Sequence, residues 1–385
     1  MEIFQPLGIN WIGPIDDISG VANVNRNVII AAMKMGIPMK CTNALQFWSH
    51  LKVGLSKDKI DLLEQAKSFN FPPKQYVTVM SFPPHYVQQL DGNAITNISY
   101  SLFETNKIPI NWPNVLNAPA ISEVWVPCKF QLASYKLGGV DSKKIKYMPM
   151  GVDTDEFVPL GPKMAFTKNN EFNFLSIMDV SSRKNPEVLL RSYFEEFKDQ
   201  DDVVLILKAY TGGADEGSRQ GIRTMIKKHK EDFKSKAKVI YLPGFLSDAQ
   251  FALLHRSVNV YVCAPRGEGW NLPALQSMAC GVPCIMPKHT SQLDFGTDEN
   301  CFWIDSTEVD ITDPHFLALD ARFYGHRWWE VDGNSLKKQM RFTYTNREEL
   351  GIRGQKARAM AEQFSWKNSV RKMVAQTAKH AQRNG

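Results

Sequence analysis

Two hydrophobic patterns alternate along the chain. Short apolar runs rich in β-branched residues are followed by stretches in which apolar residues recur every three or four positions. The short runs predict buried strands, which we place at Gly8–Gly13, Ile121–Val126, Phe172–Ile177, Val203–Leu207 and Val258–Cys263. Strands that alternate with helices are typical of parallel sheets. The pattern therefore predicts an α/β architecture.

The recurring apolar positions predict amphipathic helices between the strands. The first such helix is expected to stop at Gly36. Its apolar face consists of Val21, Val24, Val28, Ala31 and Met35. A basic helix is predicted from about Ser365 onward. Its apolar side is formed by Trp366, Val370, Met373 and Val374.

A change in composition near residue 160 separates two such α/β regions. The segment Val158–Lys163 is rich in proline and glycine, the polar segment Thr167–Glu171 follows, and the strand pattern then restarts. A chain of 385 residues, 43% of them hydrophobic, is long enough for two domains with a core each. We therefore predict domains at residues 1–160 and 161–364, followed by a C-terminal helix at residues 365–385.

Charge and cysteine content narrow the function classes. The net charge of +6 is a mild excess, which suits a protein that handles phosphates or touches an anionic membrane surface. It is too diffuse for a nucleic-acid-binding protein, which needs clustered basic residues in a recognisable module. The six cysteines lack Cys-x-x-Cys pairs and histidine partners, so neither a zinc site nor a disulfide framework is indicated.

Two features bear on location. The N-terminus lacks the charged and apolar regions of a signal peptide, and no apolar run approaches the length of a transmembrane helix, so we expect a cytoplasmic protein. The weakly basic C-terminal segment allows peripheral contact with the inner face of a membrane, and a solvated charged helix explains it equally well. Its basic residues are Lys367, Arg371, Lys372, Lys379 and Arg383.

The stretch Arg266–Pro283 is the strongest candidate for a binding site. It follows a predicted strand, loses periodicity at Gly267 and Gly269, and resumes with helical spacing from Leu272. A strand, a glycine loop and a helix N-terminus together present free backbone N–H groups and the positive end of the helix dipole. Such an arrangement suits a diphosphate.

A carboxylate and an amide accompany this loop. Glu268 can accept hydrogen bonds from sugar hydroxyls, and Gln276, two helical turns further on, lies on a similar face. An ordinary βα turn with an incidental glutamate is the alternative interpretation. The loop at Gly20, before the first helix, is another candidate approach for a phosphate, and a simple turn explains it as well.

The same stretch resembles the donor-sugar signature of the retaining nucleotide-sugar glycosyltransferases of family 4, in which a second glutamate stands where this chain has Gln276. Five further segments resemble parts of that family in the expected order. They are Met150–Phe157 (interdomain turn), Ser182–Leu190 (diphosphate loop), Leu242–Asp248 (nucleobase loop) and, shared with a subgroup, Glu104–Pro109 followed by Trp112 and the pair Trp328–Trp329.

The resemblance implies a GT-B fold: two Rossmann-like parallel-sheet domains that face a cleft, with the C-terminal helix crossing back to the first domain. It implies transfer of a sugar from a UDP-, GDP- or ADP-sugar to the hydroxyl of a glycan, glycolipid or lipid-linked acceptor, as in polysaccharide biosynthesis, with retention of configuration. It implies that the leaving phosphate accepts the acceptor's proton, so neither a metal nor another cofactor is expected. Asp153-Thr154-Asp155 spells a metal motif, but lies in the interdomain turn.

The resemblance also assigns roles to residues. Glu268, Lys184 and Glu104 are the expected catalytic residues: Lys184 neutralises the leaving diphosphate, and Glu104 contacts the donor sugar or the acceptor hydroxyl. The family usually has an arginine at the position of Asp179, so Arg183 or Lys208 is expected to substitute. The expected donor-binding residues are Gly20, Arg183, Lys208, Gly244, Phe245, Gly269, Trp270, Asn271, Leu272 and Gln276.

Two other classes remain open at this point. Asp179 and Gln276 are compatible with a catalytically degraded GT-B protein that binds a sugar nucleotide without turning it over. Another GT-B enzyme, such as a nucleotide-sugar epimerase or a phosphorylase, is the second alternative. The epimerase would use a different order of motifs, and no lysine context suited to the pyridoxal cofactor of a phosphorylase is found.

Overall fold

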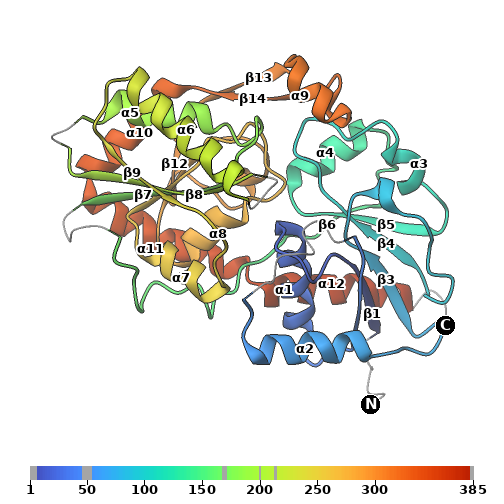
Figure 1. Ribbon diagram of the computed structural model, residues 1–385. Helices are drawn as coiled ribbons and strands as arrows, with labels where there is room; N and C mark the ends of the chain where they lie inside the picture. The colour runs from blue at the N-terminus through green and yellow to red at the C-terminus, as the bar shows by residue number, and fades with distance from the viewer. Residues whose placement is uncertain (1–6, 46–53, 167–170, 199–200, 212–214, 382–385) are drawn as a thin grey trace. The chain divides into compact units, whose positions relative to one another are not determined.

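The computed structural model describes residues 7–45, 54–166, 171–198, 201–211 and 215–381 (Figure 1). The described chain divides into two compact units. The first consists of Met1–Phe103, Lys107–Asp153 and Phe364–Gly385, and the second of Glu104–Asn106 and Thr154–Gln363. The chain passes from the first unit into the second at Asp153–Thr154, whereas the sequence predicted a domain boundary near residue 160.

The first unit is built on a parallel six-stranded sheet in the order β2-β1-β3-β4-β5-β6. Its strands are β1 (Gly8–Gly13), β2 (Met39–Asn43), β3 (Tyr76–Met80), β4 (Asn97–Tyr100), β5 (Ile121–Val126) and β6 (Ile145–Tyr147). Its helices are α1 (Gly20–Lys34), α2 (Lys57–Ser68), the 3-10 turn η1 (Pro84–Tyr86), α3 (Trp112–Leu116), α4 (Lys129–Leu137) and α12 (Trp366–Ala381). The strands predicted at Gly8–Gly13 and Ile121–Val126 are confirmed with the same bounds.

The buried face of α1 differs from the predicted one. Val24 and Val28 are buried as expected, whereas Val21, Ala31 and Met35 are only half-buried. The reason is that α1 packs against α2 and α12 as well as against the sheet, so its buried surface wraps around the helix. That surface includes polar residues such as Asn25, whose Oδ1 accepts a hydrogen bond of 3.0 Å from the indole of Trp11.

The C-terminal helix α12 belongs to the first unit. Glu123 on β5 is the anchor: one of its carboxylate oxygens accepts a 2.6 Å hydrogen bond from Gln376 and lies 3.3 Å from His380 Nε2. The backbone of Val152 also bridges to Ser365, just before the helix. The expectation that this helix returns to the first domain is therefore confirmed.

The second unit holds another parallel six-stranded sheet, in the order β12-β11-β10-β7-β8-β9. Its strands are β7 (Phe172–Asp179), β8 (Val203–Tyr210), β9 (Lys238–Leu242), β10 (Val260–Val262), β11 (Cys284–Pro287) and β12 (Cys301–Ile304). The chain order reverses between β7 and β10, which are hydrogen-bonded neighbours. This doubly wound order confirms the predicted α/β class.

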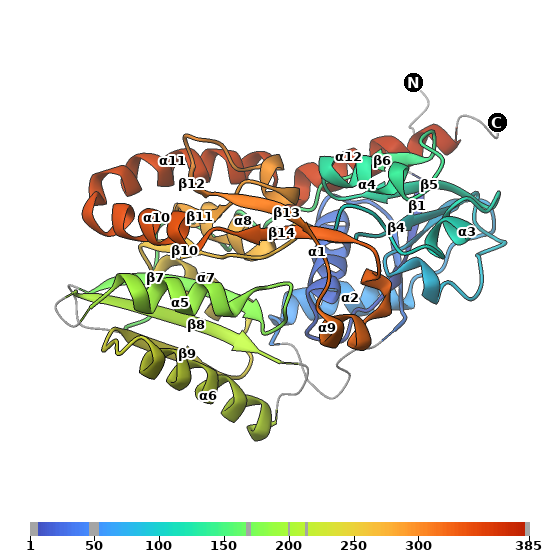
Figure 2. The same cartoon turned by 90° about the horizontal axis from the view of Figure 1, so that it is seen from above.

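Helices cover both faces of this second sheet. One layer consists of α5 (Pro186–Glu196), which packs against both α10 (Gly333–Thr345) and α6 (Glu216–Asp232). The other layer consists of α8 (Leu272–Ala279), which packs against both α11 (Arg347–Gln363) and α7 (Asp248–Arg256). Figure 2 shows α5 and α6 lying over the strands. The core between sheet and helices is strongly aromatic and includes Phe172, Phe174, Tyr193, Phe194 and Phe197.

A two-stranded antiparallel arm completes the second unit. It pairs β13 (Ser306–Asp310) with β14 (Arg327–Val331), and α9 (Pro314–Leu319) and the 3-10 turn η3 (Ala321–Phe323) connect the two strands. The arm holds the segment Glu104–Asn106: the amide N of Asn106 donates to the carbonyl of Arg327, and Thr105 Oγ1 lies 2.7 Å from His326 Nδ1.

Candidate functional site

The loops that follow β7 and β10 meet at the reversal point of the second sheet. In doubly wound sheets, ligands bind at this point, outside the carboxyl ends of the strands. Arg183 and Lys184 come from the loop after β7, and Glu268 comes from the loop after β10. Lys184 Nζ lies 2.6 Å from Glu268 Oε1, so two of the three residues predicted to be catalytic are in direct contact.

The chain turns into α8 as the sequence predicted. Leu272–Ala279 forms the helix, although the preceding strand covers only Val260–Val262 of the expected run. Asn271 adopts the left-handed conformation (φ +69°) and caps the helix, because its Oδ1 accepts from the amide N of Ala274. Its Nδ2 donates to Cys263 Sγ at 3.4 Å. Both ends of the loop are thereby tied together.

The backbone around Glu268 is held on several sides. Its amide N donates to Thr290 Oγ1 at 3.2 Å, and the amide N of Arg266 donates to the carbonyl of Arg183 at 2.7 Å. A Cβ on Gly267 would lie 2.0 Å from the carbonyl oxygen of Glu104, so only glycine allows this close approach. The loop is therefore preorganised by packing rather than left free to move.

Arg183 joins the three carboxylates of this site into one cluster. Its guanidinium lies 3.3 Å from Glu104 Oε1 and 3.7 Å from Glu268 Oε2, and it donates to the carbonyl of Gly267 at 2.9 Å. Although burial opposes the charge, Glu104, Glu268 and Asp179 raise the pKa of Arg183. The three predicted residues Glu104, Lys184 and Glu268 are thus all members of a cluster with Arg183 at its centre.

Asp179 gives this cluster one more carboxylate than cation. It is the last residue of β7, and burial raises its pKa, although Arg183 and Lys184 act in the opposite direction. Glu104, Asp179 and Glu268 therefore share the positive charge of Arg183 and Lys184. A diphosphate that binds here competes with these carboxylates for the two cations.

Lys208 lies deeper than the sequence predicted. The strand was predicted to cover Val203–Leu207, but β8 continues to Tyr210 because alternate residues still pack into the core. Lys208 is only 2% exposed, and its Nζ donates to the carbonyl of Gly244 at 2.5 Å. Burial lowers its pKa to about 8. It is a buried cation whose hydrogen bond goes to a neutral carbonyl.

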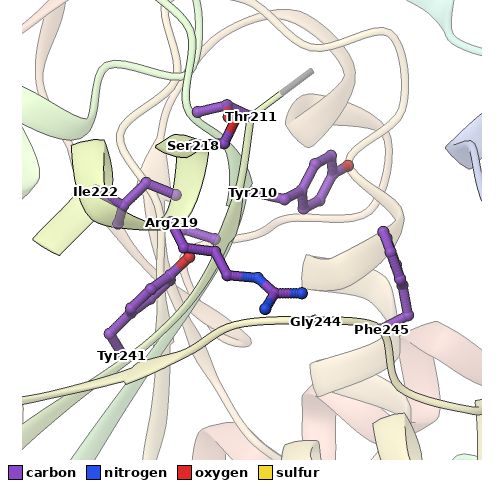
Figure 3. A pocket seen from close by; sticks show the side chains of 9 residues that line it. Tyr210, Thr211, Ser218, Arg219, Ile222, Tyr241, Gly244 and Phe245 are labelled. Atoms are coloured by element: carbon purple, nitrogen blue, oxygen red, sulfur yellow. The ribbon is translucent and has the colours of Figure 1, made fainter. Parts of the chain in front are cut away.

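The loop after β9 places Gly244 and Phe245 beside an open hollow. Gly244 has a positive φ (+78°), and Phe245 is 39% exposed. The next helix begins with a capping box, in which Ser247 and Gln250 exchange side-chain-to-backbone hydrogen bonds. Figure 3 shows the hollow, which is lined by Ala209, Tyr210, Thr211, Ser218, Arg219, Ile222, Tyr241, Gly244 and Phe245.

The remaining predicted donor residues lie in different surroundings. Trp270 is buried against Phe295, and Gly269 and Leu272 continue the same loop into α8. Gln276 lies beside the buried ring of His255 in α7; burial lowers the pKa of His255 to about 3, and Gln276 opposes this shift.

Gly20 is the first residue of α1 in the other unit, behind the N-cap Ser19. A Cβ at Gly20 would meet nothing within 4 Å, so packing does not require a glycine at this position.

Several residues that support the site were not predicted. Thr290 holds the amide of Glu268 and has a positive φ (+50°), but no pattern in the sequence marks it. Arg266 forms a bidentate pair with Glu330 of β14, at 2.7 and 3.0 Å, and its guanidinium lies 4.9 Å from the ring centre of Trp328. Arg266 stood inside the candidate stretch, but its partner is 64 residues away and could not be inferred.

Two properties concern only the described residues. No group of three or more His, Cys, Asp or Glu side chains in this part of the chain is placed to hold a metal ion. None of the helices in the described ranges is both long and apolar enough to cross a bilayer.

One known family matches part of the second unit. Residues 163–311 match the family described as glycosyl transferases group 1. The matched region contains Arg183, Lys184, Lys208 and Glu268, whereas Glu104 and β14 lie outside it. No curated protein matches the chain in sequence.

Solved structures with the same fold cover nearly the whole chain. Sucrose-phosphate synthase from Thermosynechococcus elongatus has a TM-score of 0.66 at 14% identity, covering 98% of this chain and 100% of its own. Anabaena HepE in complex with UDP and glucose has a TM-score of 0.64 at 11% identity, with coverage of 97% and 100%. The pneumococcal O-GlcNAc transferase GtfA in complex with UDP and GlcNAc has a TM-score of 0.61 at 11% identity, covering 98% of this chain and 99% of its own. The predicted GT-B fold is confirmed.

Proposed function

We propose that this protein is a retaining glycosyltransferase of family 4, which transfers a sugar from a nucleoside-diphosphate sugar to an acceptor hydroxyl. The observation that carries the proposal is the Lys184–Glu268 contact at the reversal point of the second sheet. This contact lies within the region that matches the glycosyl transferases group 1 family. The GT-B fold and the matched region together support a nucleotide-sugar glycosyltransferase.

The leaving diphosphate is assigned to Lys184 and Arg183. Both cations stand just before α5, whose N-terminus adds free N–H groups and the positive end of the helix dipole. Negative charge develops on the leaving phosphate in the transition state, and preorganised positive charge at that point is commonly the largest catalytic contribution. Lys208, buried in the neighbouring strand, adds to the positive potential.

Glu268 is assigned to the donor sugar. A diphosphate carries more negative charge than one carboxylate and so displaces Glu268 from Lys184. The carboxylate then accepts hydrogen bonds from sugar hydroxyls, while the backbone of Gly269–Leu272 and the capped N-terminus of α8 remain fixed beside it. Glu104, held by Arg183, is assigned to the donor sugar or to the acceptor hydroxyl.

The proposal also covers the stereochemistry of the reaction, the donor, the acceptor and the location of the enzyme. The leaving phosphate accepts the acceptor's proton on the face that it leaves, which gives retention of configuration without a metal ion or another cofactor. HepE has been crystallised with UDP-glucose, which supports a UDP-sugar among the candidate donors. We propose a glycan or lipid-linked acceptor, and a cytoplasmic enzyme with peripheral contact at the membrane.

A panel of nucleotide-sugars tests this function. A donor that binds the folded state raises its melting temperature by mass action. The protective nucleotide-sugar is then incubated with the protein, and release of the nucleoside diphosphate is followed with and without glycan and lipid-linked acceptors. Transfer or hydrolysis is the expected result. Protection without any release would instead identify a sugar-nucleotide-binding protein, and no protection by any nucleotide-sugar would contradict both functions.

A further inference from the structure

The hollow beside Gly244 contains a charged side chain to which nothing above assigns a role. Arg219 extends into it from α6, between Tyr241 on one side and Tyr210 and Phe245 on the other, and its guanidinium end points toward Gly244 and Phe245 (Figure 3). Tyr210 and Phe245 are 37% and 39% exposed, so both rings are accessible. The hollow thus combines flat apolar walls with one planar cation, which suits a flat, polar ring.

The donors of Arg219 are only weakly engaged by the protein. Its Nη1 lies 3.5 Å from a carboxylate oxygen of Glu216, at the limit of hydrogen-bond distance. The other oxygen of Glu216 contacts Arg223, which shares this carboxylate. Within the described chain, Arg219 Nε is buried and has no hydrogen-bond partner. A buried donor without a partner is costly, so a ligand that supplies acceptors gains binding energy here.

The position of the hollow connects it to the ion cluster. Tyr210 is the last residue of β8 and pairs in register with Asp179 at the end of β7. The hollow therefore lies two strands from the loop that carries Glu268, at the same edge of the sheet. The hollow is thus placed to hold the base, which is the end of a nucleotide-sugar remote from its sugar.

The chemistry of Arg219 separates the bases into two classes. A guanidinium only donates hydrogen bonds, so it pairs with a carbonyl oxygen and is repelled by an amino group. Among the described residues, the carboxylate of Glu216 contacts Arg219, but Arg223 shares it and it does not line the hollow, so no lining carboxylate accepts from an amino group. The hydroxyls of Thr211 and Ser218 both donate and accept, and do not discriminate.

We infer that Arg219 is a specificity-determining residue that selects donors with a carbonyl at the recognised edge of the base, uracil or guanine, over cytosine and adenine. This inference rests on the proposed function and deepens it. Arg219 and the lining rings act on the base alone, whereas Lys184 and Glu268 act on the diphosphate and the sugar. Base selection is therefore separable from turnover.

Direct binding of four nucleoside diphosphates tests the inference. The bases of UDP and GDP carry a carbonyl group at the discriminating position, where the bases of CDP and ADP carry an amino group. We expect the wild-type protein to bind the carbonyl member of at least one pair about 10- to 100-fold more tightly, which is the effect of one hydrogen bond to a charged group. The pair that shows this ratio identifies the base as a pyrimidine or a purine.

Variants assign the ratio to Arg219. Arg219→Ala should lose the preference by weakening the carbonyl member about 10- to 100-fold, and Arg219→Lys should restore part of it because the charge is kept without the planar fork. Lys228→Ala removes one exposed positive charge from the same helix and should leave the ratio unchanged. Each variant's melting temperature shows whether it is folded.

Two outcomes would overturn the inference. Equal wild-type affinity within both pairs would show that the site does not distinguish a carbonyl from an amino group. A preference that survives in Arg219→Ala would show that another group reads the base. The proposed function stands in either case. Binding of none of the four nucleotides to the folded protein would remove the proposed function, and the inference with it.

Discussion

Replacing Lys208 by methionine should make the protein more stable and at the same time weaken its binding of a nucleoside diphosphate. Lys208 is 2% exposed, and the only hydrogen bond found for its ammonium group in the described structure goes to the carbonyl of Gly244. Burial lowers its pKa from 10.5 to about 8. A tenfold change in proton affinity corresponds to about 1.4 kcal/mol, so holding the charge in the folded state costs about 3 kcal/mol at neutral pH.

Methionine has a similar shape and no charge, and the hydrogen bond that it loses is worth about 1 kcal/mol. We therefore expect Lys208→Met to raise the free energy of unfolding at neutral pH by about 2 kcal/mol. The gain depends on pH in a defined direction. Between pH 8 and 10.5 the unfolded wild-type chain keeps a proton that the folded protein has lost, so wild-type stability rises with pH across this window. Lys208→Met lacks this rise, and its advantage disappears above the window.

Urea unfolding at neutral pH and at about pH 9.5 measures both effects. Lys227→Met is the control, because the Lys227 side chain is 76% exposed and its removal should change neither the stability nor its pH dependence. Nucleoside-diphosphate binding by the same variant is measured alongside. A Lys208→Met protein that is less stable than the wild type at neutral pH, or that keeps the rise between pH 8 and 10.5, would refute the reasoning.

Two further substitutions address the ion cluster and its loop. Asp179→Asn removes a carboxylate beside Arg183 and Lys184, so the affinity for a nucleoside diphosphate should increase. At an effective dielectric constant near 20, the increase is about tenfold or more. Unchanged or weaker affinity in titration calorimetry would contradict the role given to these cations. Gly267→Ala places a Cβ 2.0 Å from the carbonyl oxygen of Glu104. This clash should cost about 1–3 kcal/mol of stability and reduce the rate of nucleoside-diphosphate release. Full activity with an unchanged melting temperature would show that the close contact between Gly267 and Glu104 is not needed.

The sequence predicted those parts of the fold and the site that depend on local patterns. The strand at Gly8–Gly13 and the helix that begins at Leu272 are each specified by a few consecutive residues, and each is confirmed. The contact between Lys184 and Glu268 joins two loops that parallel-sheet topology brings to one edge. It could be anticipated because both loops follow strands.

What could not be predicted depends on distant partners. Thr290 supports Glu268 through one side-chain oxygen, and no periodicity or motif points to it. The link from Arg183 to Glu104 spans a sequence separation that only tertiary packing sets. The burial of Lys208 was missed for a related reason: the charged residue interrupts an apolar run, yet the strand continues because its neighbours still pack into the core.

The rate of nucleoside-diphosphate release from the identified donor, compared between the wild type and Glu268→Gln, tests the central claim most directly. Glutamine keeps the shape of the side chain but removes the charge that pairs with Lys184 at 2.6 Å. Glu195→Gln is the matched control, because Glu195 pairs with Lys337 at 2.8 Å on the α5–α10 face. We expect Glu268→Gln to reduce release about 100-fold or more, while its melting temperature shows a folded protein and Glu195→Gln stays near the wild-type rate. A Glu268→Gln protein that releases nucleoside diphosphate as fast as the Glu195→Gln control would contradict the assignment of the donor site.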